Sequence, residues 1–143
     1  MAGYEVKFQP IFVVGYMHSG TTLLVTIFRK NSTLYALNVE SNFFDQLPSM
    51  RAKYPDLSNP QVRQDFTHHC FDLVVRTMKS KVAERRSFTS EEVASVLDAN
   101  PDVDDHVGLF FAVIEYFTAM DGKTHWLEKT PNHVFFVDKI IAA

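Results

Sequence analysis

The stretch that decides the fold spans residues 10–30 and reads PIFVVGYMHSGTTLLVTIFRK. Residues 10–14 form a short apolar, β-branched run that predicts a buried strand. Residues 21–30 have the apolar spacing and the terminal basic residues that are typical of a helix. The loop between them is bracketed by Gly15 and Gly20, which permit tight bending and close approach of a ligand. A strand, such a loop and a helix together favour an anion-binding turn, where loop N–H groups meet the partial positive charge of the helix start.

The spacing of these two glycines matches the phosphate loop of nucleoside triphosphatases, G-x-x-x-x-G-K-[ST], as far as Gly20. That loop then requires a lysine that reaches the outer phosphates, whereas Thr21 stands here. The loop is therefore predicted to hold phosphate without hydrolysing a nucleoside triphosphate in the usual way. The alternative is a plain strand–helix turn rich in small residues, which the glycine spacing alone would favour. The added run SGTTLL over 19–24 favours the anion site.

A second informative stretch, WLEKTPNH over residues 126–133, follows a short strand predicted at 124–128 and precedes a helix predicted at 132–141. Ligands of open α/β sheets bind outside the carboxyl ends of the strands, so we expect both loops to face one crevice. Lys129 is then expected to face that crevice. The alternative interpretation is that Lys129 is a surface lysine ahead of a helix-starting proline.

The rest of the chain alternates strand and helix patterns, which predicts an α/β fold with a parallel sheet and flanking helices in a single domain over 1–143. A second strand is expected at 33–39, closed by Glu40, and a proline-containing loop at 47–60. The remaining helices are expected at 61–81, 90–97 and from Asp104 or Asp105 to Met120.

Composition excludes several classes of protein. The 143 residues are 46% hydrophobic and 22% charged, as in ordinary globular domains. A net charge of −3 argues against a nucleic-acid binder. The single cysteine, Cys70, cannot form an internal disulfide or a cysteine zinc site and fits a reducing compartment. Since no run approaches the roughly 20 apolar residues of a membrane span and no signal peptide is apparent, a cytoplasmic location is expected.

The segment VVGYMHSGTTLL resembles the 5′-phosphosulfate-binding loop of the sulfotransferase superfamily, whose usual form is G-x-x-[RK]-[ST]-G-T-[TS]. W-x-E-K-T-P is similar to a lysine-containing segment that follows another sheet strand in that superfamily. The resemblance implies a P-loop NTPase-like fold and transfer of a sulfuryl group from 3′-phosphoadenosine 5′-phosphosulfate (PAPS), a co-substrate, without a metal. The acceptor would be a hydroxyl or amine of a small molecule, glycan or peptide. A P-loop nucleotide or phosphometabolite kinase-like protein and a non-catalytic anion-binding remnant are the alternatives.

The resemblance also implies roles for individual residues. Lys129 would reach the sulfate or its bridging oxygen, and Glu40 would accept the proton of the acceptor. The position of His133, at the start of the last predicted helix beside Lys129, separately suggests contact with the acceptor. The donor-binding residues would be Gly15, His18, Ser19, Gly20, Thr21 and Thr22.

His18 departs from the superfamily, which carries Arg or Lys at this position. It is expected to assist Lys129 in balancing charge on the leaving phosphate. Histidine is only partly charged at neutral pH, whereas arginine is always charged. A bound phosphosulfate favours the protonated imidazole, so activity is expected to fall as the pH rises.

The superfamily also has a 3′-phosphate site, with a pattern such as R-x-P-x-x-x-x-x-S, expected after the helix at 132–141. The sequence ends there, so we expect an N-terminal portion of a longer enzyme or a natural short form. The apolar helix at 107–117 is then expected to be left open to self-association.

Overall fold

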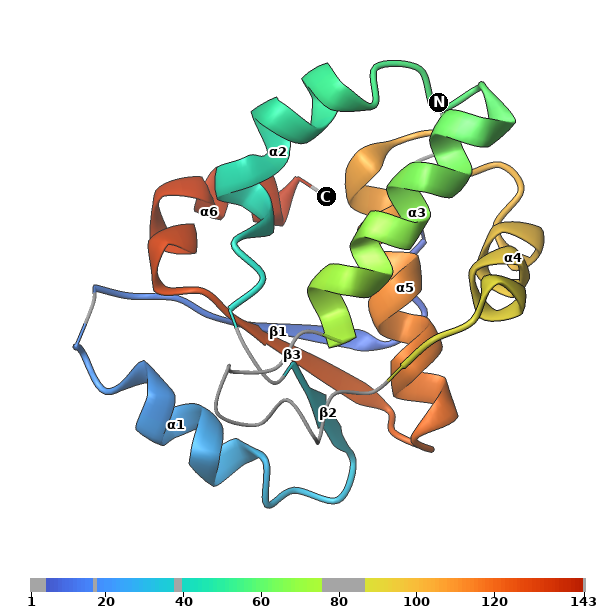
Figure 1. Cartoon of the computed structure of the whole chain (residues 1–143). Helices are drawn as coiled ribbons and strands as arrows, with labels where there is room; N and C mark the ends of the chain where they lie inside the picture. The colour runs from blue at the N-terminus through green and yellow to red at the C-terminus, as the bar shows by residue number, and fades with distance from the viewer. Residues whose placement is uncertain (1–4, 17, 38–39, 76–86, 143) are drawn as a thin grey trace.

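A parallel sheet forms the centre of the computed structural model, which describes residues 5–16, 18–37, 40–75 and 87–142. Its strands are β1 (Gln9–Val13), β3 (His125–Lys129) and β2 (Leu34–Ala36), in that spatial order (Figure 1). The middle strand, β3, pairs its Lys129 with Val13 of β1 and its Leu127 with Ala36 of β2. The predicted α/β class, with helices flanking a parallel sheet, is confirmed.

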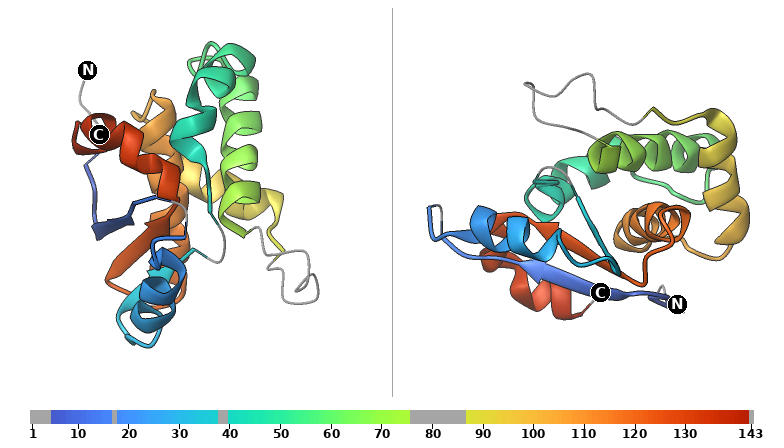
Figure 2. Two further views of the ribbon diagram at one scale, coloured as in Figure 1. Left: turned by 90° about the vertical axis from the view of Figure 1, so that its left-hand side faces the viewer. Right: turned by 90° about the horizontal axis from the view of Figure 1, so that it is seen from below.

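Helices surround this sheet on both faces. Three of them, α3, α4 and α5, pack side by side as one group (Figure 2). The helical elements of the described chain are α1 (Thr21–Phe28), α2 (Phe43–Lys53), α3 (Pro60–Val75), α4 (Ser90–Ala99), α5 (His106–Met120), the 3-10 helix η2 (Pro131–Phe136) and α6 (Val137–Ile141).

The two faces of the sheet contribute to different cores because successive strand residues point in opposite directions. Trp126 of β3 lies in the larger core, with the buried aromatic residues of α2, α3 and α5. Leu127 lies in the smaller core, where Val25 of α1 and Val13 of β1 cover the opposite face. The same alternation separates Glu128 from Lys129, which matters for the site.

The loop expected at 47–60 is wrong, because α2 continues through Pro48 to Lys53. A proline inside a helix removes one backbone hydrogen bond and usually breaks the helix. Here the apolar face of α2 is almost fully buried: Phe43 and Phe44 are 0% exposed, and Leu47 and Met50 are 3% exposed. Burial of these side chains outweighs the local preference.

The expected open apolar surface at 107–117 is also wrong. That segment lies within α5, where Leu109, Phe110 and Phe117 are completely buried against α3, α4 and the sheet. Nothing in the described residues supports self-association through this helix. The large apolar side chains that are exposed lie elsewhere, at Tyr16, Leu23, Leu24, Ile27, Met120, Phe135, Val137 and Ile141.

Several element boundaries differ from the sequence-based expectations. The second strand is shorter, Leu34–Ala36, with residues 38 and 39 outside the described ranges. The helix expected at 61–81 is α3, which ends at Val75, and 76–81 likewise lies outside the description. The last helix begins as the 3-10 turn η2.

Candidate functional site

The loop after β1 is held by the loop after β3. The Gly15 N–H donates to the carbonyl of Pro131 at 3.2 Å, and the Ser19 N–H donates to the carbonyl of Tyr16 at 3.2 Å. A Cβ on Gly15 would lie 3.0 Å from Ser19 Oγ, so any larger residue here would require the serine side chain to shift. Gly20, with a φ of 85°, is the N-cap of α1. The loop therefore turns directly into a helix start, as predicted from its glycines.

The start of α1 presents donors toward the carboxyl edge of the sheet. The first N–H groups of a helix have no acceptor within the helix, and the helix dipole adds partial positive charge there. Neighbouring His18 is exposed and has a left-handed backbone, with a φ of 64°. The hydroxyls of Thr21 and Thr22 belong to the same first turn. This arrangement suits a phosphate- or sulfate-sized anion.

Lys129, at the end of β3, joins the loop after β1 to Glu40, which lies between β2 and α2 in the chain. Its ammonium lies 3.4 Å from Thr22 Oγ1 and 2.5 Å from Glu40 Oε1. The side chain of Lys129 is 15% exposed and that of Glu40 is 41% exposed. Three segments far apart in the sequence therefore converge on one ammonium group.

A cavity of about 620 Å³ opens over this convergence. Its size is in the range of small-molecule pockets. Of the donor-binding residues expected from the sequence, Gly15 and Ser19 do not line it but shape the loop below it. The lining residues are His18, Gly20, Thr21, Thr22, Glu40, Lys129, Pro131 and Asn132.

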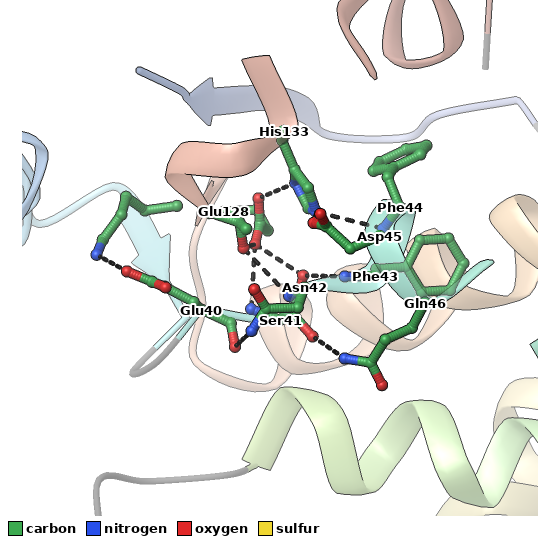
Figure 3. Close-up of polar contacts among 11 residues, drawn as sticks. Glu40, Ser41, Asn42, Phe43, Phe44, Asp45, Gln46, Glu128 and His133 are labelled. Carbon is green, nitrogen blue, oxygen red and sulfur yellow. Dashed lines mark hydrogen bonds and ion pairs between the residues drawn. The ribbon is translucent and has the colours of Figure 1, made fainter. Parts of the chain in front are cut away.

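His133 is not among the lining residues, because its side chain is completely buried. Its Nδ1 lies 3.0 Å from Glu128 Oε2, and its Nε2 accepts the Phe44 N–H at 3.2 Å (Figure 3). Asp45 Oδ2 lies 3.5 Å from the same Nε2. Because Nε2 accepts a hydrogen bond, we place the ring proton on Nδ1, where it is donated to Glu128. The structure thus puts His133 beneath the pocket rather than in contact with its contents.

Glu128 is a buried carboxylate, 0% exposed, that sequence reasoning did not single out. Burial, the largest influence, raises the pKa of Glu128. Hydrogen bonds from His133, Thr130 and Ser41, with the electrostatic attraction of His133, outweigh burial and hold the pKa below its usual value. The signal in the sequence was an acidic residue that follows the apolar pair Trp126 and Leu127 in a predicted strand and immediately precedes Lys129.

The comparisons with known proteins bear on this site. The model of the sulfotransferase family matches residues 10–143, which include both loops. The chain belongs to the sulfotransferase family. Searches of curated proteins and of solved structures find no match. Membership in the family agrees with the resemblance seen in the two loops.

Among the described residues, no group of three or more His, Cys, Asp or Glu side chains could hold a metal ion. Within the same ranges, every helix is too short or too polar to cross a bilayer.

Stability of this sulfotransferase-family chain should depend on the ionisation of Glu128. Because folding lowers the pKa of this carboxyl below 4.5, the ion stabilises the fold fully above about pH 4.5, and the contribution is lost as the pH falls through the folded-state pKa. Urea unfolding of the wild type and Glu128→Gln should therefore show a difference in free energy that shrinks below about pH 4.5. A difference that stays constant or grows with acidification would contradict this assignment.

Proposed function

We propose that the chain binds PAPS with its 5′-phosphosulfate in the pocket over Lys129 and transfers the sulfuryl group to a hydroxyl or amine. Membership in the sulfotransferase family supports sulfuryl transfer in general. The observation that carries the specific proposal is the position of the Lys129 ammonium, 3.4 Å from Thr22 Oγ1 and 2.5 Å from Glu40 Oε1. A cation at this position can contact an anion bound at the start of α1, and the Glu40 carboxylate lies next to the same cation.

The donor end of the pocket is built for an anion. The first-turn N–H groups of α1 and the hydroxyls of Thr21 and Thr22 supply hydrogen-bond donors. His18 lines the pocket beside this helix start. The position after Gly20 lacks the lysine with which nucleoside triphosphatases reach their outer phosphates. These features favour a phosphosulfate over a nucleoside triphosphate.

Chemistry at this site is a displacement at sulfur. The acceptor oxygen or nitrogen attacks the sulfur atom, and Glu40 takes the proton that the acceptor loses. The bond between sulfur and the bridging oxygen breaks, and its electron pair stays on the phosphate of adenosine 3′,5′-bisphosphate. Lys129 balances the charge that develops on that oxygen. Catalysis then depends mainly on positioning and electrostatics, as in phosphoryl transfer.

The pair formed by Glu40 and Lys129 fits this sequence of steps. Glu40 is 41% exposed, so water screens its side of the ion pair, and the negative charges of a donor can compete with Glu40 for the ammonium. Glu40 then loses its partner and is left beside the acceptor space as a proton acceptor. Asn132, which is exposed and lines the same cavity, is available to an acceptor that enters there.

Binding measurements test this proposal against its alternatives. Calorimetric titration with PAPS, adenosine 3′,5′-bisphosphate and Mg²⁺-ATP should give binding of the first two without magnesium. Preference for Mg²⁺-ATP would instead support a kinase-like protein, and absence of nucleotide binding would support an anion-binding remnant. Either result would contradict the proposal.

A pair of lysine variants makes the test specific to the site. Lys129→Met should lower the turnover of radiolabelled PAPS by about 100-fold or more, since one charge-stabilising donor is lost. Lys123→Met is the matched control, because Lys123 precedes the opposite end of β3 and donates to the carbonyl of Ser32. Equal effects of the two substitutions would contradict the role of Lys129.

His18 occupies the loop position at which the resemblance expects Arg or Lys. His18→Arg should bind PAPS more tightly, because a guanidinium is always charged and can donate two parallel hydrogen bonds to one anion. Calorimetric titration measures this change, and His68→Arg is the control, because His68 lies on α3, outside the pocket. Equal affinities of the wild type and His18→Arg for PAPS would count against the proposed role.

A further inference from the structure

The chain segment that carries Glu40 is bound to the strand that carries Lys129 through one buried carboxylate. Glu128 Oε1 accepts the Ser41 N–H at 3.2 Å, the Ser41 hydroxyl at 2.7 Å and the Thr130 hydroxyl at 2.6 Å. Its Oε2 accepts from His133 Nδ1 at 3.0 Å (Figure 3). Glu128 thus contacts the residue after Glu40 and directly precedes Lys129 in the chain.

The backbone at the start of α2 is held by the same strand and turn. Beyond Ser41, the Asn42 N–H donates to Thr130 Oγ1 at 3.2 Å and the Phe44 N–H donates to His133 Nε2 at 3.2 Å. The Phe43 N–H between them donates to Ser41 Oγ, which itself donates to Glu128. Every backbone N–H of residues 41–44 therefore donates a hydrogen bond either to Glu128 or to a side chain that is itself hydrogen-bonded to Glu128.

This cluster replaces the support that a regular N-cap would give. The N-cap residue of α2, Asn42, has a left-handed φ of 52° and makes no side-chain cap bond. Its side-chain amide instead donates to the carbonyl of Glu40 at 3.4 Å. The path of the chain from Glu40 into α2 is consequently set by contacts with β3 and η2, not by helix capping.

We propose that Glu128 is a positioning residue, which with Thr130 and His133 fixes the separation between the proton acceptor Glu40 and the charge-stabilising Lys129. The catalytic roles of Glu40 and Lys129 in this inference rest on the proposed function. The positioning of the two residues rests only on the hydrogen bonds around Glu128. Alternation along β3 explains the design: Lys129 points to the face of α1, and Glu128 points to the face that α2 covers.

An ionised acid is the group this cluster requires. Four donors converge on Glu128, and an ionised carboxylate accepts at both oxygens without presenting any donor of its own. Glutamine keeps the shape but places an N–H₂ group against at least one of these donors. Glu128→Gln should therefore displace the segment after Glu40 at nearly constant side-chain volume.

A zero-length carbodiimide cross-link measures the proposed geometry directly. The reagent joins a carboxylate to an amine only when they touch, and Glu40 and Lys129 touch in the wild type. We expect mass spectrometry to find this cross-link in the wild type and to find it lost in Glu128→Gln. The matched control is Glu115→Gln: Glu115 is 3% exposed, accepts the N–H groups of Lys7 and Phe8, and does not line the pocket.

Steady-state kinetics test whether the positioning of Glu40 and Lys129 by Glu128 affects the rate of sulfuryl transfer. Turnover of PAPS should fall about 100-fold in Glu128→Gln, the effect of displacing a reacting group by about 1 Å. The KM for PAPS should stay within about twofold, because the donor contacts at α1 are untouched. In Glu115→Gln both constants should stay near the wild-type values.

Smaller substitutions keep the test decisive if Glu128→Gln does not fold. Thr130→Val removes the hydroxyl that bonds both Glu128 and Asn42, whereas Thr130→Ser keeps it. The cross-link should be lost in the valine variant and restored in the serine variant. A cross-link that survives in folded Glu128→Gln or in Thr130→Val overturns the inference. Failure of the wild type to bind PAPS overturns the proposed function instead, since the cross-link requires no nucleotide.

Discussion

The site depends on one pairing, the parallel alignment of β1 with β3 in a register that opposes Val13 to Lys129. Parallel neighbours end at the same edge of a sheet, so the loop that leaves β1 and a lysine 107 residues beyond Thr22 meet there. The hydrogen bond from Gly15 to the carbonyl of Pro131 extends that pairing into the loops. A shift of β3 by one residue would send Lys129 to the opposite face and separate it from α1.

A second constraint is the buried carboxylate of Glu128. Removing a carboxylate from water costs several kcal/mol unless hydrogen bonds replace its hydration. The contacts from Ser41, Thr130 and His133 provide that replacement, and they are directional in a way that apolar packing is not. Such a network favours one unique arrangement of the chain around it, and the proposed function requires that precision in the placement of Glu40 and Lys129.

Sequence reasoning found the parts of the site that have local signals. Gly15 and Gly20 mark the loop because glycine permits tight bending, as the φ of 85° at Gly20 illustrates, and Lys129 is the last residue of a recognisable strand pattern. The burial of helices and side chains in the folded chain has no such local signal in the sequence. Pro48 signals a break, yet burial of Phe43 and Phe44 carries α2 through it. The apolar pattern at 107–117 predicts a helix, but it does not show that α3 and α4 pack against that helix, which is why open apolar surface was expected there. His133 and Glu128 stand in a recognised motif, but their burial follows from the crossing of α2, which no short pattern encodes.

The proposed function requires the loop after β1 and Lys129 to hold the phosphosulfate of PAPS together. Chemical shifts of the backbone amides and the lysine ammonium groups, recorded while PAPS is added without magnesium, report this contact residue by residue. The largest changes should fall on the amides of 15–22 and on the ammonium of Lys129, while the shift of Lys123 stays unchanged. Saturable changes confined to other surfaces, such as α4 and α5, with the loop and Lys129 unaffected, would contradict it.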